Sequence, residues 1–146
     1  SFELLARRKF QKLKEFYSLA SFKVSDEKRL NESGSFKPFS EARVKIFVGK
    51  KEFYSASEGN GPIHALDNAL RKALIKFYPK LKELNLIDYK VRILTPEDGT
   101  KALVRVRIES SNKNQTWSTI GVSYNVIDAS YIALHDSITY HLLKMK

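Results

Sequence analysis

The chain has 146 residues, 42% of them apolar and 12% aromatic, which is enough for one domain or two small lobes with a buried core. This composition excludes an intrinsically disordered chain, and no apolar run approaches the ~20 residues of a membrane-spanning helix, so we expect no membrane partner. The absence of cysteine excludes disulfides, thiolate zinc sites and cysteine nucleophiles, and it suits a reducing, cytoplasmic location.

Basic residues outnumber acidic ones, with 26 Lys and Arg against 16 Asp and Glu and a net charge of +10. This excess makes nucleic-acid binding a hypothesis to test. However, the basic residues are spread along the whole chain. The densest run, at residues 7–14, falls in a helical pattern and indicates a solvated helix face rather than a phosphate-binding surface.

The first third of the chain predicts a helix, a strand and a loop. Apolar residues at helical spacing predict an amphipathic helix over residues 2–17, which would join the domain to a preceding part or pack on it. Residues 19–24 predict a strand. The polar stretch 26–35 is rich in Asn, Ser and Gly and predicts a mobile loop.

A hairpin and a helix follow. Alternating apolar residues over 42–48 and 52–57 predict two strands that turn at Gly49 and Lys50. The next helix has clear ends, because Pro62 suits a first helical turn and Pro79 cannot continue one.

The second half returns to strands and closes with a helix. We expect strands at 88–95, 102–109 and 116–122, with a turn at 96–99 after the first of them. The last helix is predicted over residues 126–144, with Asn125 as its N-terminal cap.

The order of these elements repeats, which predicts an α+β fold of duplicated βββα units, 18–80 and 86–144, with internal pseudo-two-fold symmetry, preceded by a linker helix over 1–17. The repetition also appears in the residues themselves. The matching segments are 19–24 with 86–91, 42–48 with 102–108, Phe53 with Trp117, and Ala65-Leu66 with Ala133-Leu134.

The sequence offers no catalytic residues and no metal site. No Gly-x-Ser-x-Gly motif is present, and the histidines form no recognisable set. His135 and His141 are six positions apart on a helix and do not share a face, so we expect both to be surface or rim residues. Asp67 and Asp136 follow the predicted helix starts and are expected to interact with the helix dipoles rather than to form an acid–base pair.

The segment 59–65 is the most informative part of the sequence. Glycines that lead into a helix can bring backbone amides to a phosphate or a carboxylate, although a tight strand-to-helix turn without a ligand needs the same residues. A basic chain with three strands and such a helix start also fits a double-stranded RNA-binding domain. That domain carries lysines in the first helical turn, where this chain has Pro62, Ile63 and His64, so we expect no specific nucleic-acid partner.

Four segments together resemble the C-terminal regulatory domain of the isopropylmalate and citramalate synthases. They are EGNGPIHALDNAL at 58–70, LIDYKV at 86–91, GTKA at 99–102 and WSTIGVSYNVIDAS at 117–130. The resemblance covers residues 18–144, and GVSYNVIDAS with the following LHDSITY is more similar to the citramalate synthases than to most isopropylmalate synthases.

This resemblance implies a regulatory domain over residues 18–146 that forms a homodimer and binds an end-product amino acid. The effector would be isoleucine in a citramalate synthase, or leucine in the alternative, an isopropylmalate synthase. The partner in the full-length enzyme would be its own catalytic barrel. The divalent metal and acetyl-CoA would belong to that barrel, so the resemblance implies no cofactor, and no enzymatic activity, for this chain.

The resemblance also implies which residues bind the inhibitor. Backbone contacts to the amino-acid carboxylate are expected from Asn60, Gly61, Pro62, Ile63 and His64. His64 would narrow the site or add a donor. An apolar side-chain pocket is expected from Leu74, Phe77, Leu81, Ile87, Tyr89, Val91 and Ile93, although Leu74 and Val91 are equally consistent with plain core. Thr116 and Ser118 are candidates for a polar rim or for a neighbouring chain's contribution.

Overall fold

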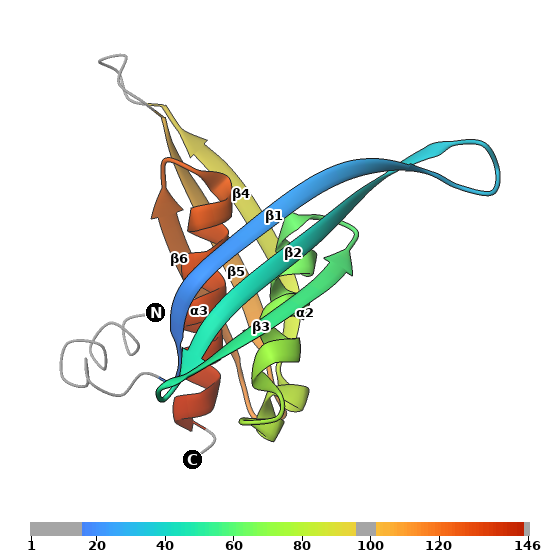
Figure 1. Cartoon of the computed structure of the whole chain (residues 1–146). Coiled ribbons are helices and arrows are strands. Elements are labelled where there is room, and N and C mark those ends of the chain that lie inside the picture. The colour runs from blue at the N-terminus through green and yellow to red at the C-terminus, as the bar shows by residue number, and fades with distance from the viewer. Residues whose placement is uncertain (1–15, 96–101, 145–146) are drawn as a thin grey trace. The chain divides into compact units, whose positions relative to one another are not determined.

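A computed structural model describes residues 16–95 and 102–144, so most of the predicted linker helix and the turn at 96–99 lie outside the described residues. The chain divides into two compact units: the first unit, Phe16–Pro79, and the second unit, which continues from Lys80. Each contains a three-stranded antiparallel sheet followed by a helix (Figure 1). The predicted α+β fold with repeated βββα units is confirmed, while their pseudo-two-fold symmetry stays a prediction.

In the first unit, the strands pair in chain order and the helix α2 (Pro62–Leu74) covers one face of the sheet. The strands are β1 (Ser18–Leu30), β2 (Phe36–Val48) and β3 (Lys51–Gly59). Alternate residues of β2 point towards the helix and are almost completely buried, namely Ala42, Val44 and Ile46. They meet the apolar stripe of α2, which consists of Ile63, Leu66, Leu70 and Leu74.

The predicted loop at 26–35 is wrong, because most of it is strand. β1 continues to Leu30 and pairs with β2 from Phe36, which leaves only residues 31–35 as a turn. Asn31 holds this turn, since its Oδ1 accepts hydrogen bonds from the amides of Ser33 and Ser35 at 3.1 and 2.9 Å. This end of the hairpin extends beyond α2 (Figure 1), so its strands need no apolar face and carry polar residues.

The second unit repeats this arrangement after the short 3₁₀ helix η1 (Pro79–Glu83). Its strands are β4 (Asn85–Leu94), β5 (Leu103–Ser111) and β6 (Thr116–Ser123), and they are followed by α3 (Val126–Lys144). The helix packs on β5 and β6. The predicted cap is confirmed, because Asn125 Oδ1 accepts hydrogen bonds from the amides of Ile127 and Asp128 at 2.7 and 3.2 Å.

Strand register defines how the two units correspond. A bulge interrupts β1 between Leu19 and Ser21 and β4 between Leu86 and Asp88, as the predicted match of these strands requires. Phe53 and Trp117 pair with equivalent residues of the central strands, Ile46 and Ser110, so this predicted match is also confirmed.

Two other predicted matches are displaced. Because Val24 pairs with Ala42 and Val91 with Val106, Ala42 corresponds to Val106, not to Ala102. The helices are displaced by one turn, because the amide of Ala65 binds the Gly61 carbonyl as that of Ala129 binds the Asn125 carbonyl. Ala65 therefore corresponds to Ala129. The predicted match with Ala133 is wrong by one helical turn, because Ala133-Leu134 repeats the residue types of Ala65-Leu66.

The expectation of a surface or rim histidine is wrong for His141. Its side chain is completely buried. The two ring nitrogens lie 2.7 Å from the Lys80 carbonyl oxygen and 3.1 Å from Asn112 Nδ2, and the ring stacks on Trp117 with centroids 6.2 Å apart. Since a carbonyl only accepts, Nε2 carries the proton and Nδ1 accepts from Asn112. His141 thus connects η1, the β5–β6 turn and α3. His135 is half-buried and stacks on Tyr131.

Candidate functional site

The two helix starts differ in how their backbone amides are satisfied. The first turn of a helix has amide donors without intrahelical acceptors, and a side chain at the cap position usually accepts from them. Asn125 does this for α3. At α2 the cap residue is Gly61, which offers no side-chain hydrogen bond. The start of α2 is therefore the more suitable of the two for an external anion.

Glycine is required at position 59 before α2 but not at position 61. A Cβ added to Gly59 would lie 2.5 Å from the amide nitrogen of Ala65, so Gly59 is required for close packing of β3 and α2. A Cβ added to Gly61 would meet nothing within 4 Å. Its backbone is extended, with φ −164° and ψ 172°, which any residue can adopt. Neither packing nor conformation requires glycine at 61.

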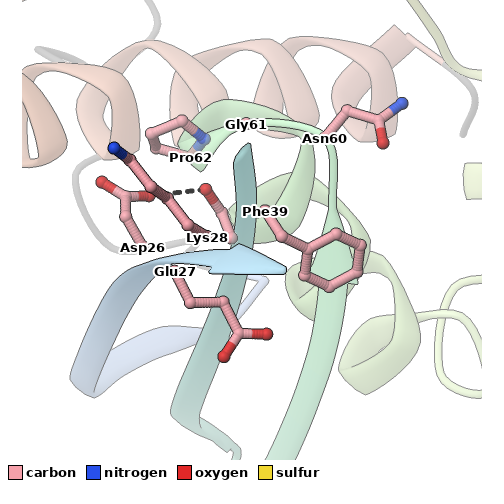
Figure 2. A pocket seen from close by; sticks show the side chains of 8 residues that line it. Asp26, Glu27, Lys28, Phe39, Asn60, Gly61 and Pro62 are labelled. Atoms are coloured by element: carbon pink, nitrogen blue, oxygen red, sulfur yellow. Dashed lines mark hydrogen bonds between the residues drawn. The ribbon is translucent and has the colours of Figure 1, made fainter. Parts of the chain in front are cut away.

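A cavity of about 460 Å³ lies beside this helix start, inside the first unit (Figure 2). The extended hairpin forms its other side, because β1 and β2 continue past the start of α2. Its lining residues are Asp26, Glu27, Lys28, Phe39, Ser40, Asn60, Gly61 and Pro62. The volume falls within the range of small-molecule sites.

Opposite charges lie close together on one wall of this cavity. Asp26 and Lys28 project from the same face of β1 towards Pro62, while Glu27 projects to the other side (Figure 2). Asp26 is held in place by Ser40, a buried residue of β2 whose Oγ donates a 2.6 Å hydrogen bond to Asp26 Oδ1. The cavity thus combines an oriented carboxylate, an ammonium group and an uncapped helix start.

The structure brings together only part of the predicted site. Asn60, Gly61 and Pro62 line the cavity; Ile63 is buried in the core and His64 is exposed in the first turn of α2. The remaining predicted residues of the first unit are Leu74, at the other end of α2, and Phe77, three residues beyond it. The helix is ~18 Å long at 1.5 Å per residue, so both lie far from its start. Leu74 is completely buried, and Phe77 packs edge-on against Phe53 with ring centroids 4.6 Å apart.

The other predicted residues belong to the second unit. Leu81 is buried in η1. Thr116 is exposed at the start of β6, and Ser118 accepts a 2.9 Å hydrogen bond from Arg107 Nη2. The four predicted residues of β4 are all exposed: Ile87, Tyr89, Val91 and Ile93. The strand register places Tyr89, Val91 and Ile93 on the same sheet face as Val106 and Ile108. The helix α3 packs on that face over β5 and β6, and β4 lies next to the strands that it covers.

Sequence reasoning missed the hairpin wall, namely Asp26, Glu27, Lys28, Phe39 and Ser40. Its signal was present in the alternation Ser40, Ala42, Val44, Ile46, which continues the buried face of β2 to a serine. Within residues 16–95 and 102–144, no group of His, Asp and Glu side chains could hold a metal ion. The helices described there are not long and apolar enough to cross a membrane.

Comparison with known proteins gives a family match over nearly the whole chain. The model of the LeuA allosteric (dimerisation) domain matches residues 1–142. Two (R)-citramalate synthases, from Geobacter sulfurreducens and Aquifex aeolicus, are each 54% identical over 144 residues, which is 99% of this chain and 27% of the relative. A 2-isopropylmalate synthase from Shewanella sediminis is 32% identical over 93 residues, 64% of this chain and 16% of the relative.

These matches favour the citramalate synthase alternative over the isopropylmalate synthase one and give no support to an RNA-binding domain. This chain spans about a quarter of the length of the citramalate synthases that it matches. The repeated βββα units, both helix-start motifs and the family match agree. The chain belongs to the LeuA allosteric (dimerisation) domain family.

Proposed function

We propose that this chain is the feedback-regulatory domain of an (R)-citramalate synthase and that it binds isoleucine as an end-product inhibitor. The observation that carries the proposal is the uncapped start of α2 at Gly61, which faces an oriented carboxylate and an ammonium group. The whole-chain similarity to citramalate synthases supports the enzyme class. In this role the chain supplies no catalytic residue, and the metal and acetyl-CoA belong to the catalytic part.

The charges of the cavity match those of a free α-amino acid. Its carboxylate would accept hydrogen bonds from the amides at the start of α2 and interact with Lys28, since the helix dipole and the ammonium both favour an anion there. Its ammonium group would bind Asp26, which Ser40 keeps in a fixed orientation. Asn60 and Phe39 would complete the wall around the bound amino acid.

We further propose that two copies of the chain associate to complete the site, and that the apolar part of the effector then meets exposed apolar residues on β4 of the second copy. Ile87, Val91 and Ile93 are respectively 53, 45 and 66% exposed, so each has surface to bury. Apolar surface on β4 that no helix covers also supports association of two chains. Burying it would exclude water from both the effector and the strand.

Calorimetric titration of the chain with isoleucine and with leucine tests the proposal. We expect an isoleucine dissociation constant between about a micromolar and a millimolar, or roughly −8 to −4 kcal/mol. Leucine differs by the position of one methyl group, so we expect it to bind more weakly by about 1–3 kcal/mol. Equal or tighter binding of leucine would favour the isopropylmalate synthase alternative, and absence of binding to either would contradict an effector site.

Two further measurements test the partners. Sedimentation should show a dimer at micromolar concentration, and a clean monomer would contradict the dimer-associated site. Duplex RNA should bind only in the non-specific range of about 10⁻⁴–10⁻⁶ M near physiological salt. A tight, salt-resistant duplex complex would contradict a purely regulatory role.

A further inference from the structure

The outward face of the second sheet, on the side away from α3, carries a block of four cations. Lys90 pairs directly with Arg107, and Arg92 pairs directly with Arg105, so two like-charged rows lie next to each other along β4 and β5. Each row ends on an aliphatic residue of β6, because Arg107 pairs with Ile120 and Arg105 with Val122. Ile120 and Val122 are 39 and 44% exposed.

Like charges directly opposite each other destabilise a sheet. Within residues 16–95 and 102–144, none of the four cations forms an ion pair. The adjacent row contains Asp88 and Glu109, which face each other, but neither carboxylate forms a salt bridge to the block. The two like-charged pairs therefore cost stability within this unit, although Arg107 also donates a 2.9 Å hydrogen bond to Ser118.

The first unit gives an internal comparison. Its equivalent pair, Lys23 opposite Arg43, lies on the outward face of the first sheet. There Arg43 Nε lies 3.1 Å from Glu41 Oε1, in an exposed salt bridge. By register the position of Glu41 corresponds to Arg105 in the second unit, so an anion in one repeat is a cation in the other. At these four paired positions the second unit thus carries four cations, where the first unit carries two cations, a carboxylate and a serine.

We propose that the outward face of the β4–β5–β6 sheet, around Arg92 and Arg105, docks on an acidic protein surface in the remainder of the synthase. This inference rests on the proposed function, in which the chain is part of a longer enzyme. The citramalate synthases that it matches are roughly four times as long as this chain. Exposed aliphatic residues beside unpaired cations fit a protein surface with an apolar centre and charged surroundings. A single-stranded nucleic acid would instead favour aromatic side chains on which bases stack, and the six residues of the two rows include none.

The test uses the full-length synthase and two charge-reversed variants. Arg92→Glu with Arg105→Glu removes the proposed contact. Lys50→Glu with Lys51→Glu makes the same change in net charge at the exposed β2–β3 turn of the first unit and serves as the control. A carbodiimide, which joins an amine to a carboxylate in direct contact, is applied to each protein and the products are identified by mass spectrometry.

We expect Lys90 to be cross-linked to Asp or Glu outside residues 1–146 in the unchanged protein and in the control. The cross-link should be lost in the Arg92/Arg105 variant, whose inhibition by isoleucine should weaken about tenfold or more, because like charges across an interface repel. Calorimetric binding of isoleucine should not change, which separates docking from effector binding. If isoleucine does not bind even to the unchanged enzyme, the proposed function fails while the cross-link still reports on docking.

Three outcomes would overturn the docking proposal. The first is the absence of any Lys90 cross-link in the unchanged enzyme. The second is a cross-link that joins Lys90 only to carboxylates within residues 1–146. The third is nuclease-sensitive retention of RNA that the Arg92/Arg105 variant loses and the control keeps, which would identify a nucleic acid as the occupant.

Discussion

Replacing Gly61 with asparagine separates the structural role of the α2 start from its role in binding. The substitution copies the cap of α3, where Asn125 Oδ1 accepts from two helix amides. The backbone at Gly61 is already extended, as a cap residue needs, and its added Cβ would enter open space. We therefore expect Gly61→Asn to fold normally and to gain a few tenths of a kcal/mol of stability.

The same side chain should compete with the effector. It would occupy the amides that are proposed to hold the amino-acid carboxylate, and losing a hydrogen bond to a charged group costs about 1.5–3 kcal/mol. Isoleucine binding should weaken by about tenfold to a hundredfold. At a concentration of about a hundred times the dissociation constant, isoleucine stabilises the unchanged protein by ~2.7 kcal/mol, which raises Tm by about 8 °C. In the variant this increase should fall to roughly 1–4 °C.

Thermal melting with and without isoleucine provides the assay, with two control variants. Gly61→Val should also lose the isoleucine shift, because valine obstructs the approach of a ligand without capping the helix. Gly59→Ala should lower Tm in both conditions, because its Cβ would meet the backbone of Ala65. A Gly61→Asn protein that is folded and still shows the full isoleucine shift would refute the helix-start site.

Three further predictions concern stability. Gly121→Ala should lower the free energy of unfolding by about 1–3 kcal/mol, because its Cβ would collide with the Ala129 carbonyl oxygen. Urea denaturation measures this, and an unchanged midpoint would contradict this packing. His141→Phe should cost about 1–3 kcal/mol by leaving the Lys80 carbonyl and Asn112 without their partner, and a neutral effect would contradict the bridging role. Burial raises the pKa of Tyr78 above 10.0, so its contribution to stability is complete below pH 10 and is lost as the pH rises through the raised pKa. Denaturant titrations should show that Tyr78→Phe, which removes the 2.6 Å hydrogen bond to the Phe16 carbonyl, loses less stability between neutral and alkaline pH than the unchanged protein, and equal losses would contradict this.

The sequence predicted correctly those elements that combine a regular spacing of apolar residues with residues that mark where the element begins or turns. Pro62 marks the start of α2 and Asn125 caps α3, and between such signals the apolar residues recur with helical period. The β2–β3 hairpin turns as predicted, where Gly49 adopts φ 65°. These features depend on local conformation, which a single sequence records directly.

The features that the sequence did not predict, the hairpin wall of the cavity and the buried His141, depend on contacts between residues far apart in the chain. The strands around Asp26 and Lys28 carry polar residues because they extend beyond the helix, so their composition is typical of a loop although their backbone is paired. His141 sits in an apparently ordinary helical position, and only the carbonyl of Lys80, 61 positions earlier, explains its burial. Neither partner is visible in local spacing, so the hairpin wall and the buried histidine both required the fold.

The segment Gly59-Asn60-Gly61 combines two different requirements, and the structure separates them. Position 59 requires glycine because β3 approaches α2 too closely for a Cβ, so glycine is needed there whether or not a ligand binds. Gly61 is demanded by neither packing nor backbone conformation, and as a cap it is weaker than the asparagine at the equivalent position of α3. A position that forgoes stability without a structural reason is where a function is expected. Because the open helix start faces Asp26 and Lys28, the first unit is the half of this domain in which we expect the carboxylate and ammonium of the effector to bind.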